Sequence, residues 1–271
     1  MFNLILVKIK TNLNRICFSI SMDIAKIKSM KGKEAIVVLT CYGYPMAKVL
    51  EEEGVDIILV GDSLGNVVLG YESTKEVTMQ DMIRHTGAVR RGAVTSFIVA
   101  DMPYKSDETN EMALKNANLL IDNGADAVKV EGKPEIVKFL VQNRIAVIGH
   151  IGHLPQTAEK PVVHRDFNEL LKKAEVLQNA GAFAIVLEMV QSEVAQKITD
   201  FLSIPTIGIG AGPYCDGQVL VINDMLGMFE DFKPKFVKKY AKVNQDIRNA
   251  VKEYKKDVKK GDFPSEEYSF K

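Results

Sequence analysis

Residues 57–65 of the chain read Ile57-Ile58-Leu59-Val60-Gly61-Asp62-Ser63-Leu64-Gly65. The first four residues are apolar without interruption, which indicates a strand buried on both faces of a parallel sheet, since a half-exposed strand would alternate. Asp62 follows the carboxyl end of that strand, where α/β sheets and barrels build their sites. Taken alone, Asp62 is better explained as a turn or helix-capping residue. Its meaning depends on whether the arrangement recurs.

Apolar runs of strand length occur eight times along the chain. They are Ala35–Thr40, Asp56–Val60, Phe97–Ala100, Ala127–Val130, Ala146–Ile148, Ala184–Leu187, Thr206–Ile209 and Val219–Ile222. Segments with helical periodicity lie between most of them, namely Pro45–Glu53, Thr78–Arg91, Glu108–Asn123, Pro134–Gln142, Asn168–Ala180 and Ser192–Phe201. This alternation predicts a parallel sheet with helical crossovers. Eight units over roughly 190 residues favour an α/β fold of the closed (β/α)8 TIM-barrel type, with an open doubly wound sheet as the alternative.

We expect residues 22–271 to form one barrel domain with a C-terminal helical tail, which begins near Phe229 and is rich in lysine. Residues 1–21 carry basic residues and no acid. They are consistent with a disordered extension, a start codon assigned too far upstream, or a transit or signal-like peptide.

Composition argues against several classes of protein. The 271 residues are 46% hydrophobic and 26% charged, with 35 basic and 35 acidic side chains. Without a global positive field, nucleic acid is not an expected partner, and no apolar run has the length of a membrane span. Cys17, Cys41 and Cys215 are odd in number and lack CxxC spacing, which indicates reduced thiols and predicts a cytoplasmic protein.

Acidic residues recur at the ends of the predicted strands. The four that do so are Asp62, Asp101, Glu131 and Glu188. They are separated by 39, 30 and 57 residues, which corresponds to one, one and two βα units of a barrel. We therefore expect these acids to lie on one rim, three of them on adjacent strands.

Carboxylates that face one another repel unless a positive group lies between them. Oxygen ligands without a cysteine or histidine cluster favour Mg²⁺ over zinc, and predict a metal site at Asp62, Asp101 and Glu131. Mg²⁺ commonly takes one or two carboxylates directly, so some of the three acids are expected to bind through water. The alternative is that these acids form salt bridges with Lys129, Arg84 or Arg90.

Lys129 and Glu131 share one face of their strand, because side chains at i and i+2 point the same way. A lysine facing the barrel interior requires an anion, either a substrate carboxylate or one of the acids. Ser63 is placed to donate to the same anion, although a plain turn serine explains it equally well.

Two further motifs are less specific. His150 and His153 follow the fifth predicted strand, and a positioning or proton-relay role for His150 competes with that of an ordinary loop histidine. The segment Gly208-Ile209-Gly210-Ala211-Gly212 is compatible with a phosphate-binding loop or with close approach of the backbone to the barrel mouth.

Several motifs together resemble the ketopantoate hydroxymethyltransferase family from about residue 22 to residue 243. They are Val60-Gly61-Asp62-Ser63-Leu64-Gly65, Val68-Leu69-Gly70-Tyr71, Val99-Ala100-Asp101-Met102-Pro103, Gly149-His150-Ile151-Gly152, Gly181-Ala182-Phe183-Ala184-Ile185-Val186-Leu187-Glu188, Ile204-Pro205-Thr206-Ile207-Gly208-Ile209-Gly210-Ala211-Gly212 and Asp224-Met225-Leu226-Gly227. The resemblance implies a (β/α)8 barrel of the phosphoenolpyruvate/pyruvate-binding type. It also implies Mg²⁺ dependence, 5,10-methylenetetrahydrofolate as one-carbon donor, a role in pantothenate biosynthesis, and a homo-oligomer, commonly a decamer.

The resemblance also implies roles for individual residues. Asp62, Asp101 and Glu131 match the metal site, and Asp62, Ser63, Asp101 and Lys129 match the contacts to the 2-oxo acid. Glu188 matches the general base. On this basis the chain is expected to transfer a hydroxymethyl group to 3-methyl-2-oxobutanoate, giving 2-dehydropantoate.

Two segments depart from the family pattern. The family usually has Tyr-Asp-Tyr where this chain has Tyr42-Gly43-Tyr44. After the fifth strand the chain reads His153-Leu154-Pro155-Gln156, and the following Thr157–Arg165 is shorter than usual and lacks glycine. We expect this departure to affect the lid over the site and not the acids.

Two rival functions remain open at this stage. One is a Mg²⁺-enolate lyase of the same barrel superfamily, although such enzymes typically use a Lys-Cys loop that this chain lacks. The other is a catalytically inactive barrel retained for binding or assembly.

Overall fold

The computed structural model describes residues 24–230 and 234–270. The predicted N-terminal extension, residues 1–21, lies outside the described residues. The chain divides into two units, one ending at Leu220 and the other beginning at Val221, and each is described by itself.

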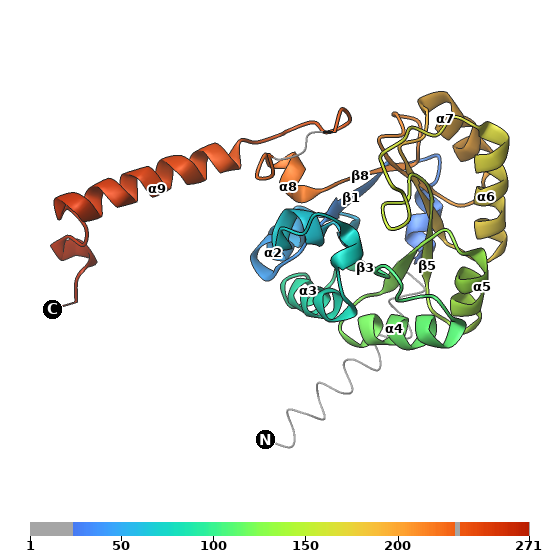
Figure 1. Cartoon of the computed structure of the whole chain (residues 1–271), viewed down its shortest axis with the longest axis horizontal. Coiled ribbons are helices and arrows are strands. Elements are labelled where there is room, and N and C mark those ends of the chain that lie inside the picture. The colour runs from blue at the N-terminus through green and yellow to red at the C-terminus, as the bar shows by residue number, and fades with distance from the viewer. Residues whose placement is uncertain (1–23, 231–233, 271) are drawn as a thin grey trace, which may run out of the picture. The chain divides into compact units, whose positions relative to one another are not determined.

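Eight parallel strands form a closed barrel in the first unit, each hydrogen-bonded to the next in sequence, with β8 returning to β1 (Figure 1). The strands are β1 (Ile36–Thr40), β2 (Ile57–Val60), β3 (Phe97–Asp101), β4 (Ala127–Glu131), β5 (Val147–Gly152), β6 (Ala184–Glu188), β7 (Thr206–Ile209) and β8 (Gly217–Leu220). The prediction of a (β/α)8 barrel is confirmed, and the open sheet is excluded because the sheet has no free edge.

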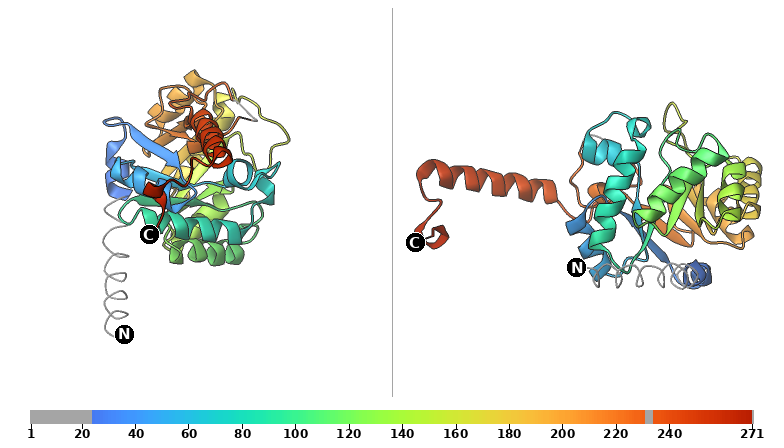
Figure 2. Two further views of the ribbon diagram at one scale, coloured as in Figure 1. Left: turned by 90° about the vertical axis from the view of Figure 1, so that its left-hand side faces the viewer. Right: turned by 90° about the horizontal axis from the view of Figure 1, so that it is seen from below.

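Helices surround the barrel, as two views at right angles show (Figure 2). They are α2 (Tyr44–Glu52), α3 (Met79–Gly92), α4 (Asn110–Asp122), α5 (Pro134–Gln142), α6 (Phe167–Asn179) and α7 (Ser192–Phe201). Short helical turns η1 (Gly65–Leu69) and η2 (Thr74–Glu76) lie between β2 and α3. Local sequence explains the helix starts. Thr78 and Asp81 form a reciprocal capping box at α3, and Pro134 occupies the first turn of α5.

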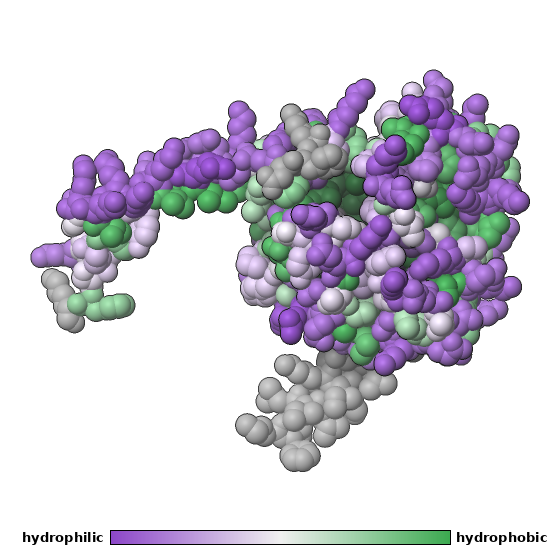
Figure 3. Space-filling view, viewed as in Figure 1, coloured by the Kyte–Doolittle hydropathy of each residue, from purple (hydrophilic) through white to green (hydrophobic). Residues whose placement is uncertain are grey.

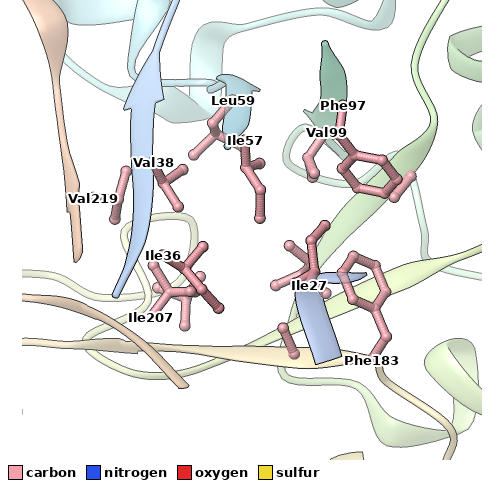
Figure 4. Close-up of a cluster of buried hydrophobic side chains, with 14 of the residues drawn as sticks. Ile27, Ile36, Val38, Ile57, Leu59, Phe97, Val99, Phe183, Ile207 and Val219 are labelled. Atoms are coloured by element: carbon pink, nitrogen blue, oxygen red, sulfur yellow. The ribbon is translucent and has the colours of Figure 1, made fainter. Parts of the chain in front are cut away.

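Alternate strand residues point inward and fill the barrel with aliphatic side chains (Figure 4). Ile57 and Leu59 illustrate the alternation on β2. Ile27, from a helical turn at residues 24–30, joins this core beside Phe97 and Phe183, whose rings meet edge to face at 5.9 Å. These large side chains close the barrel at the amino-terminal ends of its strands.

The same alternation delivers polar residues at the opposite end. Along β3 the inward positions run from Phe97 through Val99 to Asp101, and along β4 from Ala127 through Lys129 to Glu131. Strand register pairs Asp101 with Lys129, Glu131 with His150, and Glu188 with Gly152. The carboxyl ends of neighbouring strands therefore bring these side chains together.

Two strand predictions are wrong. The fifth strand does not stop at Ile148 but continues to Gly152, so His150 lies inside β5 and only His153 follows it. Backbone pairing with both neighbours sustains the strand beyond its apolar run. The eighth strand is Gly217–Leu220 rather than Val219–Ile222, because Ile222 begins a helix.

The second unit contains α8 (Ile222–Met225), α9 (Val243–Lys260) and η3 (Glu266–Tyr268). One side of α9 is apolar (Figure 3), and its exposed side chains Ile247, Val251, Tyr254 and Val258 repeat at helical spacing. Among the described residues, no helix combines the length and the apolar character that crossing a membrane requires.

Candidate active site

Three carboxylates meet at the barrel mouth and are called the acid cluster below: Asp62, Asp101 and Glu131. Asp101 ends β3, Glu131 ends β4, and Asp62 follows β2. All three are buried, with 5%, 3% and 6% of their surface exposed. The backbone N–H of Asp62 donates to Asp101 Oδ2 at 3.0 Å. The strand-end spacing thus predicted a real spatial cluster.

Lys129 is buried among these acids. Its Nζ lies 3.2 Å from Asp101 Oδ1 and 4.0 Å from Glu131 Oε1. Burial alone would lower the pKa of Lys129, but the charges of Asp101, Glu131 and Asp62 raise it above its ordinary value. The salt-bridge alternative therefore holds for Lys129, whereas Arg90 pairs instead with Asp126 at 2.5 Å.

His150 bridges the acid cluster and Glu188. Its Nδ1 lies 3.5 Å from Glu131 Oε1, and its Nε2 lies 3.3 Å from Glu188 Oε2. Burial and Lys129 lower the pKa of His150, but the two carboxylates outweigh them and raise it overall. The Glu188 side chain is 17% exposed, compared with 4% for Glu131, so Glu188 faces the solvent side of the cluster.

The acid cluster is short of positive charge. Burial, followed by the charge of Asp101, raises the pKa of Asp62 well above its ordinary value, and Lys129 only partly opposes this. Glu131 behaves differently. Burial would raise its pKa, but His150, Lys129 and the backbone N–H of Gln156 together lower it. Of these two carboxylates, Asp62 is therefore the one whose charge the neighbouring groups compensate less.

The residues fit Mg²⁺ chemistry. Asp101 Oδ1 is buried and accepts no aligned hydrogen bond, although the Lys129 ammonium is nearby. Within residues 24–230 and 234–270, no three Asp, Glu, His or Cys side chains are arranged so that they could hold a metal ion by themselves. Mg²⁺ does not require one, because it usually takes one or two carboxylates and completes its shell with water and substrate oxygens.

Gln156 is a site residue that sequence reasoning missed. Its Nε2 donates to Asp62 Oδ2 and to the carbonyl of Met102, each at 2.8 Å, and its backbone N–H donates to Glu131 Oε2 at 3.2 Å. No periodic signal marks it, because Gln156 lies in the loop after β5 and not in a strand. This part of the divergent loop therefore enters the site.

The rest of that loop is tied to the end of β6. The backbone N–H of His164 donates to the carbonyl of Met189 at 2.8 Å, and that of Gln191 donates to the carbonyl of His164 at 2.9 Å. The shorter Thr157–Arg165 segment thus still crosses beside the strand that carries Glu188.

Ser63 is held in place by a second overlooked residue. Its Oγ lies 2.8 Å from the hydroxyl of Tyr42, in the segment that departs from the family pattern. A Cβ on Gly61 would lie 2.8 Å from Ser63 Oγ, so a larger residue at position 61 would displace this hydroxyl.

The glycine-rich segment after β7 is explained by close packing. A Cβ on Gly212 would lie 2.0 Å from Ser192 Oγ, and the residue has a φ of +79°. This contact accounts for Gly212 without a bound phosphate.

Comparisons with known proteins agree with this geometry. Residues 21–266 match the family profile described as ketopantoate hydroxymethyltransferase. The chain is 51% identical over 262 residues to the 3-methyl-2-oxobutanoate hydroxymethyltransferase of Thermotoga maritima, covering 92% of this chain and 96% of that protein. It is 52% identical over 260 residues to the protein of the same name from Thermosipho africanus, covering 92% and 98%.

Solved structures support the type of barrel. A 2,3-dimethylmalate lyase of the PEP mutase/isocitrate lyase superfamily aligns with a TM-score of 0.61 at 15% identity, covering 87% of this chain and 88% of that one. A phosphonopyruvate hydrolase aligns with a TM-score of 0.62 at 12% identity, covering 91% and 93%. These similarities confirm the predicted (β/α)8 barrel fold.

Proposed function

Because the chain belongs to the ketopantoate hydroxymethyltransferase family, we propose that the barrel mouth transfers a hydroxymethyl group from 5,10-methylenetetrahydrofolate to 3-methyl-2-oxobutanoate. Family membership makes the chain a transferase. The donor and the metal dependence belong to the proposal. The observation that carries it is the buried acid cluster with Lys129 inside it and Glu188 at its edge.

Asp62, Asp101 and Glu131 would hold Mg²⁺, directly or through water. When bound, the ion supplies a Lewis acid that polarises the keto group of the substrate. The raised pKa of Asp62 supports this assignment, since it marks a buried carboxylate whose charge a cation would offset. Asp101 Oδ1 has the Lys129 ammonium at 3.2 Å but no aligned hydrogen bond, so it too can accept a cation.

Lys129 and Ser63 would bind the 2-oxo acid. The Lys129 ammonium is fixed by Asp101 at 3.2 Å, so it can present its charge to a substrate carboxylate without reorganising. Ser63 is oriented by Tyr42 and can donate a hydrogen bond to the same ligand. A small 2-oxo acid would therefore be held by its carboxylate beside Lys129 and Ser63.

Glu188 would remove the C3 proton of the bound oxo acid. It lies 3.3 Å from His150, which can stabilise the carboxylate or pass its proton onward. The resulting enolate carbon would bond to the methylene carbon of the donor, both bonds from that carbon to the folate nitrogens would break, and a water oxygen would bond to it as the new hydroxyl group. The C3 proton and one proton of the water would go to the two nitrogens, so the products are 2-dehydropantoate and tetrahydrofolate.

The alternative function, a Mg²⁺-enolate lyase, is less well supported. Enzymes of that kind typically place a cysteine after a lysine in a mobile loop, whereas Cys41 follows Thr40 and Cys215 follows Tyr214. Burial raises the pKa of both thiols, which makes them poor nucleophiles.

One assay tests the proposal against both rivals. Purified protein is mixed with Mg²⁺, 3-methyl-2-oxobutanoate and 5,10-methylenetetrahydrofolate, and 2-dehydropantoate is measured by mass spectrometry. The expected result is product that disappears when the metal is chelated and returns when Mg²⁺ is restored. Absence of product with all three components present would contradict the proposal.

We also propose that the enzyme is a cytoplasmic homo-oligomer. The free thiols of Cys41 and Cys215 are consistent with a reducing compartment. The apolar side of α9 is exposed in the single chain, as expected for a surface that contacts another copy. Sedimentation analysis would test this, with a monomer at micromolar concentration as the contrary result.

A further inference from the structure

A second cavity lies beside the acid cluster on the same rim of the barrel. Its volume is about 510 Å³, within the range of small-molecule sites. It is formed by η2 and the start of α3 on one side and by the loop after β3 with α4 on the other. The lining residues that matter here are Lys75, Tyr104, Lys105, Ser106 and Met112.

Two ammonium groups lie over the ring of Tyr104, which lines this cavity. Lys75 Nζ lies 5.9 Å and Lys105 Nζ lies 5.4 Å from the centre of the Tyr104 ring. Within the described ranges, neither lysine forms an ion pair with a carboxylate. Glu76 is the acid in the lining, and its Oε1 already accepts the backbone N–H of Ser73. The cavity thus combines net positive charge with a stacking surface.

The floor of the cavity contains an unused polar group. Ser106 Oγ is buried and has no hydrogen-bond partner among the described residues. The Ser106 carbonyl is fixed by the side-chain amide of Asn116 at 2.7 Å, so the turn is rigid on its backbone side. A buried hydroxyl left unpaired is uncommon and indicates a ligand or water partner.

The cavity also has an apolar wall, made by Val77, Met79, Pro103 and Met112. Met112 is 39% exposed, so apolar surface is available to a ligand from solvent. An occupant that uses every feature of the cavity is flat and aromatic and carries carboxylates.

The loop after β3 connects this cavity to the acid cluster. Asp101 ends the strand, the carbonyl of Met102 accepts from Gln156, and Pro103 and Tyr104 then form the cavity wall. The cavity and the acid cluster are therefore built from adjacent residues of one loop, which places them next to each other on the rim.

We infer that this cavity binds the aminobenzoyl-glutamate portion of the folate donor, an inference that rests on the proposed function. The benzoyl ring stacks on Tyr104, and the glutamate carboxylates are met by Lys75 and Lys105. Ser106 Oγ supplies a hydrogen bond to an amide or carboxylate oxygen. The cavity thereby adds affinity for the donor without contacting the 2-oxo acid.

The experiment compares four variants with the wild-type enzyme: Lys75→Gln/Lys105→Gln, Tyr104→Leu, Tyr104→Phe, and the control Lys138→Gln/Lys172→Gln. The control removes the same charge from two exposed lysines outside the cavity. Binding of p-aminobenzoyl-glutamate is measured by calorimetry, alongside glutamate alone and inorganic phosphate. The KM for the donor and the exchange of the C3 proton of the oxo acid in deuterated water are measured in parallel.

The double cavity variant is expected to raise the donor KM about five- to tenfold and to weaken the probe similarly, since exposed ion pairs contribute modestly. Tyr104→Leu acts in the same direction, whereas Tyr104→Phe and the control stay at the wild-type value. C3 proton exchange is unchanged in all four, because it needs no donor.

Equal probe binding in the wild type and the double cavity variant would overturn the inference. Equally tight binding of inorganic phosphate would overturn it too, because it would indicate a general anion site. Failure of the proposed function can be distinguished from failure of the cavity inference. In the former case, the wild-type protein neither exchanges the C3 proton nor makes product. In that case, binding of p-aminobenzoyl-glutamate would still show whether the cavity is its binding site.

Discussion

Gln156 and Asp62 are 94 positions apart in the sequence and are joined by a hydrogen bond of 2.8 Å from Nε2 to Oδ2. The same side-chain nitrogen donates to the Met102 carbonyl, so the amide is fixed between two loops. Asp62 is thereby held in one orientation, because its Oδ2 accepts the hydrogen bond from Gln156.

We predict that Gln156→Ala lowers the affinity for Mg²⁺ about 10- to 100-fold, as loss of a group that orients a metal ligand commonly does. Titration calorimetry with Mg²⁺ measures this directly. Gln142→Ala, at an exposed position on α5, is the control and keeps the wild-type affinity. Equal affinity in the two variants would show that Asp62 is oriented by other means.

For Glu188→Gln we expect loss of C3 proton exchange by about 10²- to 10⁴-fold, the usual contribution of a general base. The amide keeps the size of the side chain and can still contact His150, so Mg²⁺ and oxo acid binding are retained. Proton NMR in deuterated water follows the exchange. Exchange at the wild-type rate would remove Glu188 as the base.

Asp62→Asn should stabilise the metal-free protein above neutral pH. Burial and Asp101 raise the pKa of Asp62 in the folded state. The folded protein therefore binds this proton more tightly than the unfolded chain, and stability falls as pH rises through the raised pKa. Asparagine cannot ionise and avoids that loss.

In chelator at pH 8, the melting temperature of Asp62→Asn is expected to exceed that of the wild type by roughly 2–4 °C. The difference narrows on acidification, as the wild-type carboxyl takes up its proton. Added Mg²⁺ reverses the order by stabilising the wild type. A variant that melts lower at every pH would contradict the electrostatic explanation.

Lys129→Met tests the charge inside the acid cluster. Removing one partner of a buried ion pair typically costs about 3–5 kcal/mol, which at about 2 °C per kcal/mol lowers the melting temperature of a domain this size by roughly 6–10 °C. Lys138→Met, on the exposed side of α5, is the matched control. A melting temperature equal to that of the control would mean that Asp101 and Glu131 do not depend on the ammonium.

The barrel was predictable because its signal is repetitive. Uninterrupted apolar runs such as Ile57–Val60 mark buried parallel strands, and eight of them in sequence leave few alternatives. The end of β5 was not predictable in this way. Gly149 and His150 interrupt the apolar run, yet both remain in the strand because they pair with β4 and β6.

The acids of the site were predictable for the same reason, since strand order and side-chain alternation together fix their position. Gln156 and Tyr42 were not, because loop residues have no periodicity that relates them to the strands. Their contacts depend on how the loop after β5 and the turn after β1 fold in three dimensions. The charge balance around Lys129 likewise became clear only from distances.

The packing of Ile27 against Phe97 and Phe183 has a kinetic consequence. A barrel filled by side chains at the amino-terminal ends of its strands is open only at the carboxyl ends, so reactants and products must enter and leave there. Under the proposed function, the oxo acid would bind beside Lys129 and the donor near Tyr104. A donor that covers the oxo acid requires the oxo acid to bind first and its product to leave last, so we predict sequential, ordered steady-state kinetics.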